Sequence, residues 1–141
     1  MGNSVDAFLS AVEKGDKETV FSYILRYPEK WKTAKREFAG ETCLHLARDA
    51  EMARYLISVG AEMEAKSLQM TPFVSAASDG NREVMEVLIE NGCNIHAKGP
   101  LGEALAYASR NGHLGIVKQL IGLGLNFNDK SNPSRTALLL W

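Results

Sequence analysis

Apolar residues recur along this chain with a period of 32 residues. The segments 56–60, 88–92 and 120–124 each begin with Leu-Ile and end with Gly, and each lies 32 residues after the one before. A fourth copy, 24–28, keeps an apolar pair and ends in Pro, another helix terminator. A period of this length indicates stacked supersecondary units, none of which can bury its apolar face alone. The chain is therefore predicted to be a tandem-repeat stack that acts through its surface.

The third unit shows the predicted secondary structure most clearly. Thr71 and Pro72 suit a helix start, because a hydroxyl can accept an orphan N–H and the ring already has a helical φ. A break at 79–81 separates this helix from a second one, which ends at Gly92. The following stretch, 93–102, is too long for a simple link and contains Gly and Pro, so a hairpin-like finger is expected.

Segment 40–47 reads Gly-Glu-Thr-Cys-Leu-His-Leu-Ala and resembles the ankyrin signature Gly-x-Thr-Pro-Leu-His-x-Ala, with Cys in place of Pro. Segments 60–66, 71–73 and 111–117 supply the remaining pieces of that pattern, so the resemblance covers nearly the whole chain. It implies an all-α solenoid of helix-turn-helix units with hairpin-like fingers, in which fingers and first helices line a concave side.

The signature Thr position is a marker for the repeat boundaries. It falls at Asp6, Thr42, Thr71, Glu103 and Thr136, in steps of 36, 29, 32 and 33 residues. The predicted repeats are an N-terminal cap repeat at 4–36, then 37–67, 68–99 and 100–132, and a truncated fifth repeat at 133–141. The short step arises because 48–51 replaces a longer Gly-His turn, so the second repeat is expected to have a clipped first helix.

The net charge narrows the class of partner, and the cysteines indicate the compartment. The 141 residues include 16 basic and 17 acidic ones, for a net charge of -1, so neither nucleic acid nor an anionic membrane is expected as a partner. No apolar run approaches the length of a membrane span. Cys43 and Cys93 lack metal-ligand spacing, which favours a reducing compartment; the cytoplasm is expected, with the nucleus as the alternative.

The sequence contains no recognisable catalytic or cofactor motif. His45, His96 and His113 fall in three different parts of three different units, and no nucleophile stands beside a base or within a phosphate-binding loop. The resemblance implies a structural, backbone-bonding role for His45. No enzyme activity, metal or cofactor is therefore expected. Trp31 and Tyr27 allow two interpretations: they cover the open end of the first repeat, or they form an exposed anchor for a partner.

The resemblance implies a non-enzymatic protein-interaction module. An alternative is that the chain is a segment of a larger protein, acting as a regulatory or substrate-recruiting subunit, for example of a ubiquitin ligase. The predicted core comprises Leu44, Leu46, Leu56, Val84, Leu88, Val117 and Leu120. The predicted partner-binding residues lie at the ends of the first helices and at the finger tips: Arg48, Asp49, Ser67, Leu68, Gln69, Met70, Ser78, Asp79, Pro100, Leu101, Arg110 and Asn111. The apolar members of this set either contact a partner or pack on the adjacent finger.

Two further expectations concern modification and self-association. Ankyrin fingers are hydroxylated by an asparaginyl hydroxylase that prefers Leu eight positions upstream, so Asn128 with Leu120 is a candidate, and His96 with Leu88 has the same spacing. Asn128 could equally hold its turn by bonding the backbone. The apolar segment 137–141 has no following helix, so it is expected to fold back on the fourth repeat or to mediate self-association.

Overall fold

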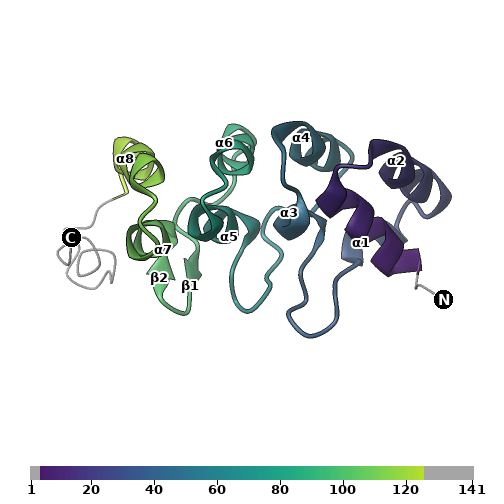
Figure 1. Ribbon diagram of the computed structural model, residues 1–141, viewed down its shortest axis with the longest axis horizontal. Coiled ribbons are helices and arrows are strands. Elements are labelled where there is room, and N and C mark those ends of the chain that lie inside the picture. Colours follow the sequence, from purple (N-terminus) through teal and green to yellow (C-terminus); the bar gives the residue numbers. More distant parts are fainter. Residues whose placement is uncertain (1–3, 126–141) are drawn as a thin grey trace.

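The computed structural model describes residues 4–125, which form two layers of helices side by side along the molecule (Figure 1). The first-helix layer contains α1 (Ser4–Lys14), α3 (Cys43–Leu46), α5 (Pro72–Asp79) and α7 (Ala104–Arg110). The second-helix layer contains α2 (Lys17–Arg26), α4 (Ala50–Ser58), α6 (Arg82–Glu90) and α8 (Leu114–Gly122). A short 3₁₀ helix, η1 (Lys30–Thr33), follows α2. This arrangement confirms the predicted all-α solenoid.

Four of the described helices begin at a side-chain cap that the sequence supplies. The N-caps of α2, α4, α5 and α6 are Asp16, Asp49, Thr71 and Asn81. In each case the side-chain oxygen accepts a hydrogen bond from the backbone N–H three residues later, which satisfies a donor that the helix itself leaves unpaired. The Thr71-Pro72 helix start is thereby confirmed. At the other end of α5, Gly80 adopts a left-handed φ of 79° and turns the chain toward α6.

The second repeat has the predicted clipped first helix. α3 contains 4 residues, whereas α5 contains 8. Asp49 explains the difference, because its carboxylate accepts from the Met52 N–H at 2.7 Å and starts α4 almost immediately after α3 ends. The shortened turn is accommodated because each repeat needs only to contact its neighbours.

A continuous apolar core lies between the two layers. All seven residues predicted for it are no more than 4% exposed. At the N-terminal end, Trp31 is 1% exposed and packs edge-on against Phe8, whose ring centroid is 6.3 Å away. Tyr23 stacks on Phe8 with ring centroids 4.7 Å apart, and Tyr27 in turn packs on Tyr23 at 4.8 Å. Trp31 therefore covers the end of the stack and is not an exposed anchor.

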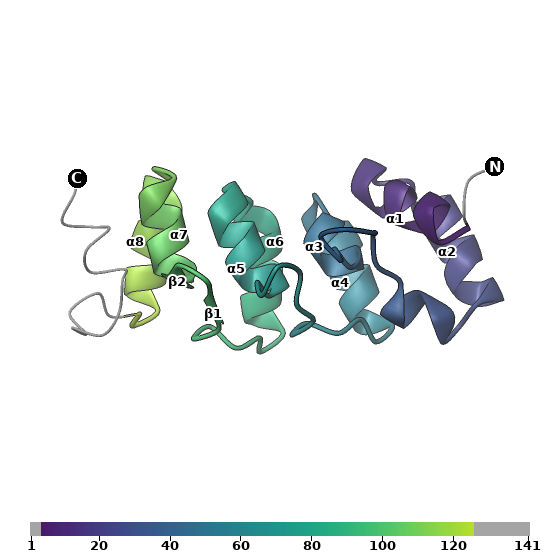
Figure 2. The same ribbon diagram turned by 90° about the horizontal axis from the view of Figure 1, so that it is seen from below.

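Three hairpin-like fingers project from the first-helix layer. Figure 2, seen from below, looks along the fingers and shows them side by side in front of the helices. Finger 1 (35–42) contains an antiparallel bridge between Lys35 and Thr42, and finger 2 (66–71) one between Ser67 and Met70. Finger 3 (98–103) contains the short strands β1 (Lys98–Gly99) and β2 (Gly102–Glu103). The finger predicted within 93–102 is thus confirmed.

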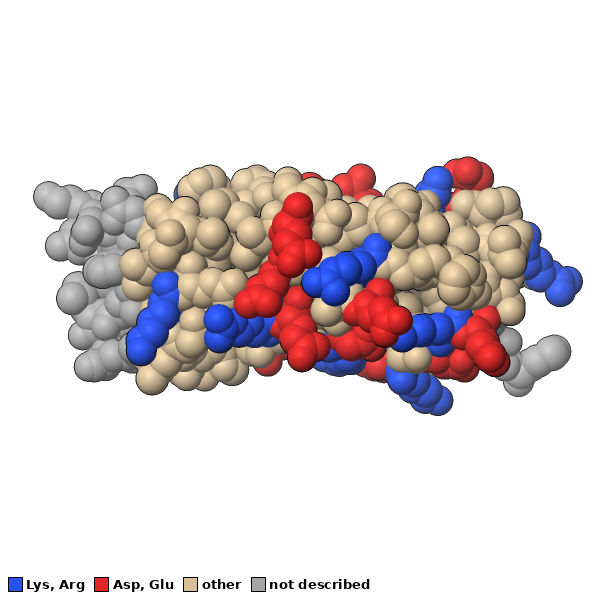
Figure 3. All heavy atoms as spheres, turned by 90° about the horizontal axis from the view of Figure 1, so that it is seen from above, with Lys and Arg blue, Asp and Glu red and all other residues tan. Residues whose placement is uncertain are grey.

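The outer face of the second-helix layer has a band of mixed charge (Figure 3). Ion pairs within this band connect neighbouring repeats: Lys17 of α2 pairs with Glu51 of α4. Arg54 of α4 lies 3.6 Å from Glu90 of α6. These pairs are exposed and contribute little stability each, but they leave much of this face with its charges already matched.

Some sequence predictions fall outside the part of the chain that the structure describes. Asn128 and segment 137–141 both lie beyond residue 125. Within 4–125, no helix combines the length and the apolar character that crossing a membrane requires.

Candidate protein-binding surface

The predicted binding residues form two separate rows. One row, here called the turn edge, consists of the residues where each first helix ends: Arg48, Asp49, Ser78, Asp79, Arg110 and Asn111. The other row consists of the finger tips. Each finger leads into the start of a first helix and each turn follows its end, so the length of that helix separates the rows, about 12 Å for the eight residues of α5.

Hydrogen bonds between repeats occupy much of the turn edge. The Asn81 side-chain amide donates to the Arg48 carbonyl oxygen at 3.2 Å. One repeat later, the Asn111 side-chain amide donates to the Ser78 carbonyl oxygen at 2.8 Å. His113 Nε2 also lies 2.9 Å from the Ser78 carbonyl oxygen. These contacts hold successive turns in register, and the partner-binding role of Ser78 and Asn111 stays a prediction.

The charged residues of the turn edge differ in whether they form ion pairs. Arg48 lies 3.1 Å from Glu13 of α1, and Glu13 also lies 2.8 Å from Arg36. The hydrogen bonds from these two guanidinium groups hold the pKa of Glu13 below its usual value, and the bond to Glu13 raises the pKa of Arg36. Asp79 and Arg110, in contrast, are exposed and form no ion pair within residues 4–125. Asp79 and Arg110 are thus the turn-edge charges that a partner could contact most directly.

Finger 2 presents its tip through an unusual backbone conformation. Leu68 and Gln69 have φ values of 51° and 67°, as in a type I′ turn, although neither is a residue that favours the left-handed region. Leu68 is 68% exposed. Ser67, by comparison, is buried and donates its hydroxyl to the Ala39 carbonyl oxygen at 2.8 Å, so it connects finger 2 to finger 1 and is not accessible to a partner.

Finger 3 is held by Tyr107. The Leu101 N–H donates to the Tyr107 hydroxyl at 2.9 Å. A Cβ on Gly99 would lie 2.6 Å from that hydroxyl and 3.0 Å from the Met70 side chain, so only Gly fits where fingers 2 and 3 meet. Of the tip residues, Met70 packs on the next finger, whereas Pro100 and Leu101 remain exposed. Leu101 is 42% exposed.

Finger 1 supplies a residue that the sequence prediction missed. Phe38 is fully exposed and has a φ of 68°. It precedes Thr42 by four residues, whereas Leu68 precedes Thr71 by three and Leu101 precedes Glu103 by two. The separation from the signature position differs from finger to finger, so an alignment on that position would not have identified Phe38. All three finger tips are therefore apolar, and together they form the tip row: Phe38, Leu68 and Leu101.

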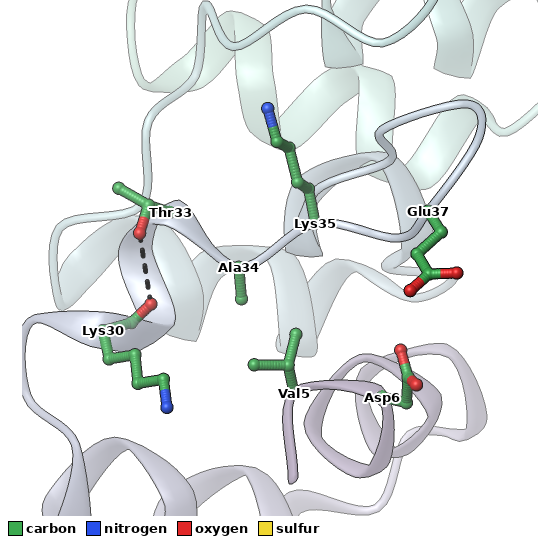
Figure 4. Close-up of a pocket in the computed structure, with 7 residues that line it drawn as sticks. All are labelled: Val5, Asp6, Lys30, Thr33, Ala34, Lys35 and Glu37. Atoms are coloured by element: carbon green, nitrogen blue, oxygen red, sulfur yellow. Dashed lines mark hydrogen bonds between the residues drawn. The ribbon is translucent and has the colours of Figure 1, made fainter. Parts of the chain in front are cut away.

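Two hollows lie beside the fingers. The first, about 320 Å³, is lined by Val5, Asp6, Lys30, Thr33, Ala34, Lys35 and Glu37, and Figure 4 shows that the Lys35 side chain points away from Val5 and Asp6. The second, about 410 Å³, lies between fingers 2 and 3 and is lined by Glu64, Lys66, Thr71, Asn94, His96, Ala97 and Lys98. His96 is exposed there, with Nδ1 3.7 Å from the Glu103 carboxylate, and its hydroxylation stays a prediction.

Neither hollow resembles a metal site. Within residues 4–125, no group of three or more His, Cys, Asp or Glu side chains could hold a metal ion. Both thiols are buried, and burial raises the pKa of Cys43 and of Cys93 to about 12. The most distinctive features of this surface are the exposed apolar finger tips and the exposed charges of the turn edge.

A comparison with protein families agrees with this geometry. The family model for ankyrin repeats (three copies) matches residues 8–99, about two thirds of the chain. The chain belongs to the ankyrin-repeat family. Ankyrin repeats are generally protein–protein interaction modules. The helices α7 and α8 continue the same ankyrin stack beyond the matched range. No curated protein sequence is significantly similar to this chain.

Proposed function

We propose that this ankyrin domain is a non-enzymatic module that binds a partner protein through the concave side of the stack, by its tip row and the exposed charges of its turn edge. The supporting observation is the contrast between core and tips. The core side chains are sealed between the two helix layers, yet Phe38, Leu68 and Leu101 are 103%, 68% and 42% exposed. Apolar residues at these positions do not contribute to the core, and a partner that buried them would gain roughly 1 to 3 kcal/mol for each.

The fingers suit this function because they are largely preformed. Ser67 connects finger 2 to finger 1, and Met70 contacts finger 3. A partner would therefore dock on side chains whose backbone is already ordered, at a small cost in conformational entropy.

Affinity capture from a cell lysate, with the full chain as bait and mass spectrometry as readout, tests the proposal. Substitution of the tip row (F38A, L68A and L101A together) or of the turn-edge charges (D79A with R110A) is expected to reduce capture and leave the melting temperature nearly unchanged. Leu25→Ala is the matched control, because Leu25 is 78% exposed but lies on α2 in the other layer. Val87→Asp, at a position that is 0% exposed, should unfold the stack. Capture that survives both surface variants would contradict the proposal and favour the second-helix face.

A further inference from the structure

Each finger carries a lysine at the same structural position. In fingers 1 and 3, Lys35 pairs with Thr42 and Lys98 pairs with Glu103. In finger 2 the Ser67–Met70 bridge places Lys66 opposite Thr71. The paired residues Thr42, Thr71 and Glu103 all occupy the signature position, so the three lysines repeat with the stack. We call Lys35, Lys66 and Lys98 the lysine row.

The lysine row is exposed and forms no ion pair within the described residues. All three side chains are exposed, and none forms an ion pair within residues 4–125. On the helix layers, by contrast, Lys17 and Arg54 have carboxylate partners. Every finger thus presents one exposed ammonium group near its base and one apolar side chain at its tip.

The surroundings of the lysine row favour separate carboxylates over a polyanion. Asp6 and Glu37 line the first hollow beside Lys35, and Glu64 lines the second beside Lys66 and Lys98. A phosphate backbone would bring closely spaced negative charges near these carboxylates as well as near the lysines. A polypeptide can place one carboxylate at each lysine and none between them.

The repeat spacing specifies how those carboxylates should be spaced. The first helices pack directly on one another, α1 on α3, α3 on α5 and α5 on α7. Directly packed helices lie about 8–10 Å apart, so successive fingers are separated by about the same distance. One turn of a polyproline II helix has three residues and rises about 9.3 Å, which places every third side chain on one face at that spacing.

We propose that the tip row and the lysine row bind an acidic segment of the partner in a polyproline II conformation, with a carboxylate at every third position and an apolar residue beside each carboxylate. The carboxylates pair with Lys35, Lys66 and Lys98, and the apolar side chains pack on Phe38, Leu68 and Leu101. Three fingers are spanned by roughly seven residues of such a segment. This inference rests on the proposed function and specifies the chemistry of the partner.

Fluorescence anisotropy with the full chain and a labelled peptide of four Glu-Leu-Pro triplets tests the spacing. Saturable binding is expected. A peptide of the same composition with Glu, Leu and Pro in separate blocks, and one with Gln in place of Glu, should each bind about tenfold more weakly or not at all. Equal binding of the block peptide, or no binding of the triplet peptide, would overturn the inference. So would tighter binding of single-stranded oligothymidine or of phosphatidylserine vesicles.

Variants test the two rows separately. The combination K35Q, K66Q and K98Q is expected to weaken triplet-peptide binding about tenfold at low ionic strength and to remove most of its salt dependence. The combination K14Q, K17Q and K118Q removes the same charge from other exposed sites and should leave binding unchanged. Circular dichroism and thermal melting verify that both variants fold. Equal effects of the two triple variants would show a general charge effect and overturn the assignment of the lysine row.

The two proposals fail in distinguishable ways. If the tip-row variant loses its captured partner but the triplet peptide shows no preference for spacing, the proposed function stands and the acidic polyproline II segment is wrong. If lysate capture and peptide binding are both insensitive to the tip row, the proposed function is wrong as well.

Discussion

His45 joins the second repeat to the third through the carbonyl oxygen of Met70, which lies 2.9 Å from Nε2. The other ring nitrogen, Nδ1, accepts from the Thr42 backbone N–H at 3.2 Å and lies 2.8 Å from the Thr42 hydroxyl. Because a carbonyl only accepts and a backbone N–H only donates, the two contacts together require the neutral ring with its proton on Nε2. The backbone-bonding role predicted for His45 is thus confirmed, and it extends across a repeat boundary.

Stability is expected to depend on pH through His45. Burial lowers the pKa of His45 below the ordinary value of 6.5, so on acidification the unfolded state takes up this proton before the folded state does. The contribution of His45 to the free energy of unfolding should therefore be largest above about pH 6.5. It should decrease as the pH drops from there toward the folded-state pKa. Urea titrations between pH 8 and 5 measure this slope.

His45→Gln should flatten the slope at the cost of lower stability at pH 8. The slope of the His45→Gln variant is the decisive measurement, because a decrease that persisted with unchanged size would assign the effect to other groups.

Alanine substitutions at Gly80 and Gly92 should distinguish the stability cost of backbone strain from that of side-chain crowding. Both have a left-handed φ, 79° and 80°. A Cβ on Gly80 would lie 2.8 Å from His113 Cε1, whereas a Cβ on Gly92 would meet nothing within 4 Å. Gly92→Ala should cost about 1 kcal/mol for the backbone conformation. Gly80→Ala should cost about 1 to 3 kcal/mol more, because the His113 ring must move and loses its bond to Ser78.

Chemical denaturation of the two glycine variants measures this difference. Addition of His113→Ala to Gly80→Ala relieves the crowding, so the two substitutions together should cost less than the sum of each alone. Equal costs for Gly80→Ala and Gly92→Ala would show that the close approach to His113 is unimportant.

Replacement of Leu68-Gln69 by Asn-Gly should make the domain more stable and a weaker binder. Asn and Gly tolerate the left-handed φ of a type I′ turn, so the change should stabilise the fold by about 1 kcal/mol. It also removes the apolar tip of finger 2. Leu68→Ala removes the tip but keeps the strain, and it is therefore the matched control, with lower affinity and no gain in stability. A loss of stability in the Asn-Gly variant would contradict the turn assignment.

Both cysteines should react only after unfolding. With a pKa of about 12, the thiols of Cys43 and Cys93 are almost entirely protonated at neutral pH, and both side chains are buried. Reaction with a chromogenic disulfide at pH 8 should be slow for the native chain and rapid in denaturant, and Cys43→Ala and Cys93→Ala would assign each phase. Rapid labelling of the native protein would contradict this prediction and indicate local opening of the structure around the two cysteines.

Much of the fold could be predicted because repeats constrain sequence strongly at local positions. The spacing of Leu56, Leu88 and Leu120 identified the stack, since each must return to the same place between the layers. Caps such as Thr71 and terminators such as Gly92 act on their own helices, so their effects are visible in the sequence without knowledge of the contacts. The clipped helix before Asp49 was predictable for the same reason.

The binding surface was less predictable, because the exposure of a side chain and its hydrogen-bond or ion-pair partners depend on residues distant in the chain. Ser67 and Leu68 are adjacent in the sequence, yet one is buried against Ala39 and the other is 68% exposed. Phe38 reads as an ordinary core residue until finger 1 is seen to turn it outward. The local pattern predicts helices and their ends because those depend on residues within a few positions. Only the stacking of separate repeats decides which charges are paired, which finger tips are exposed and which lysines align.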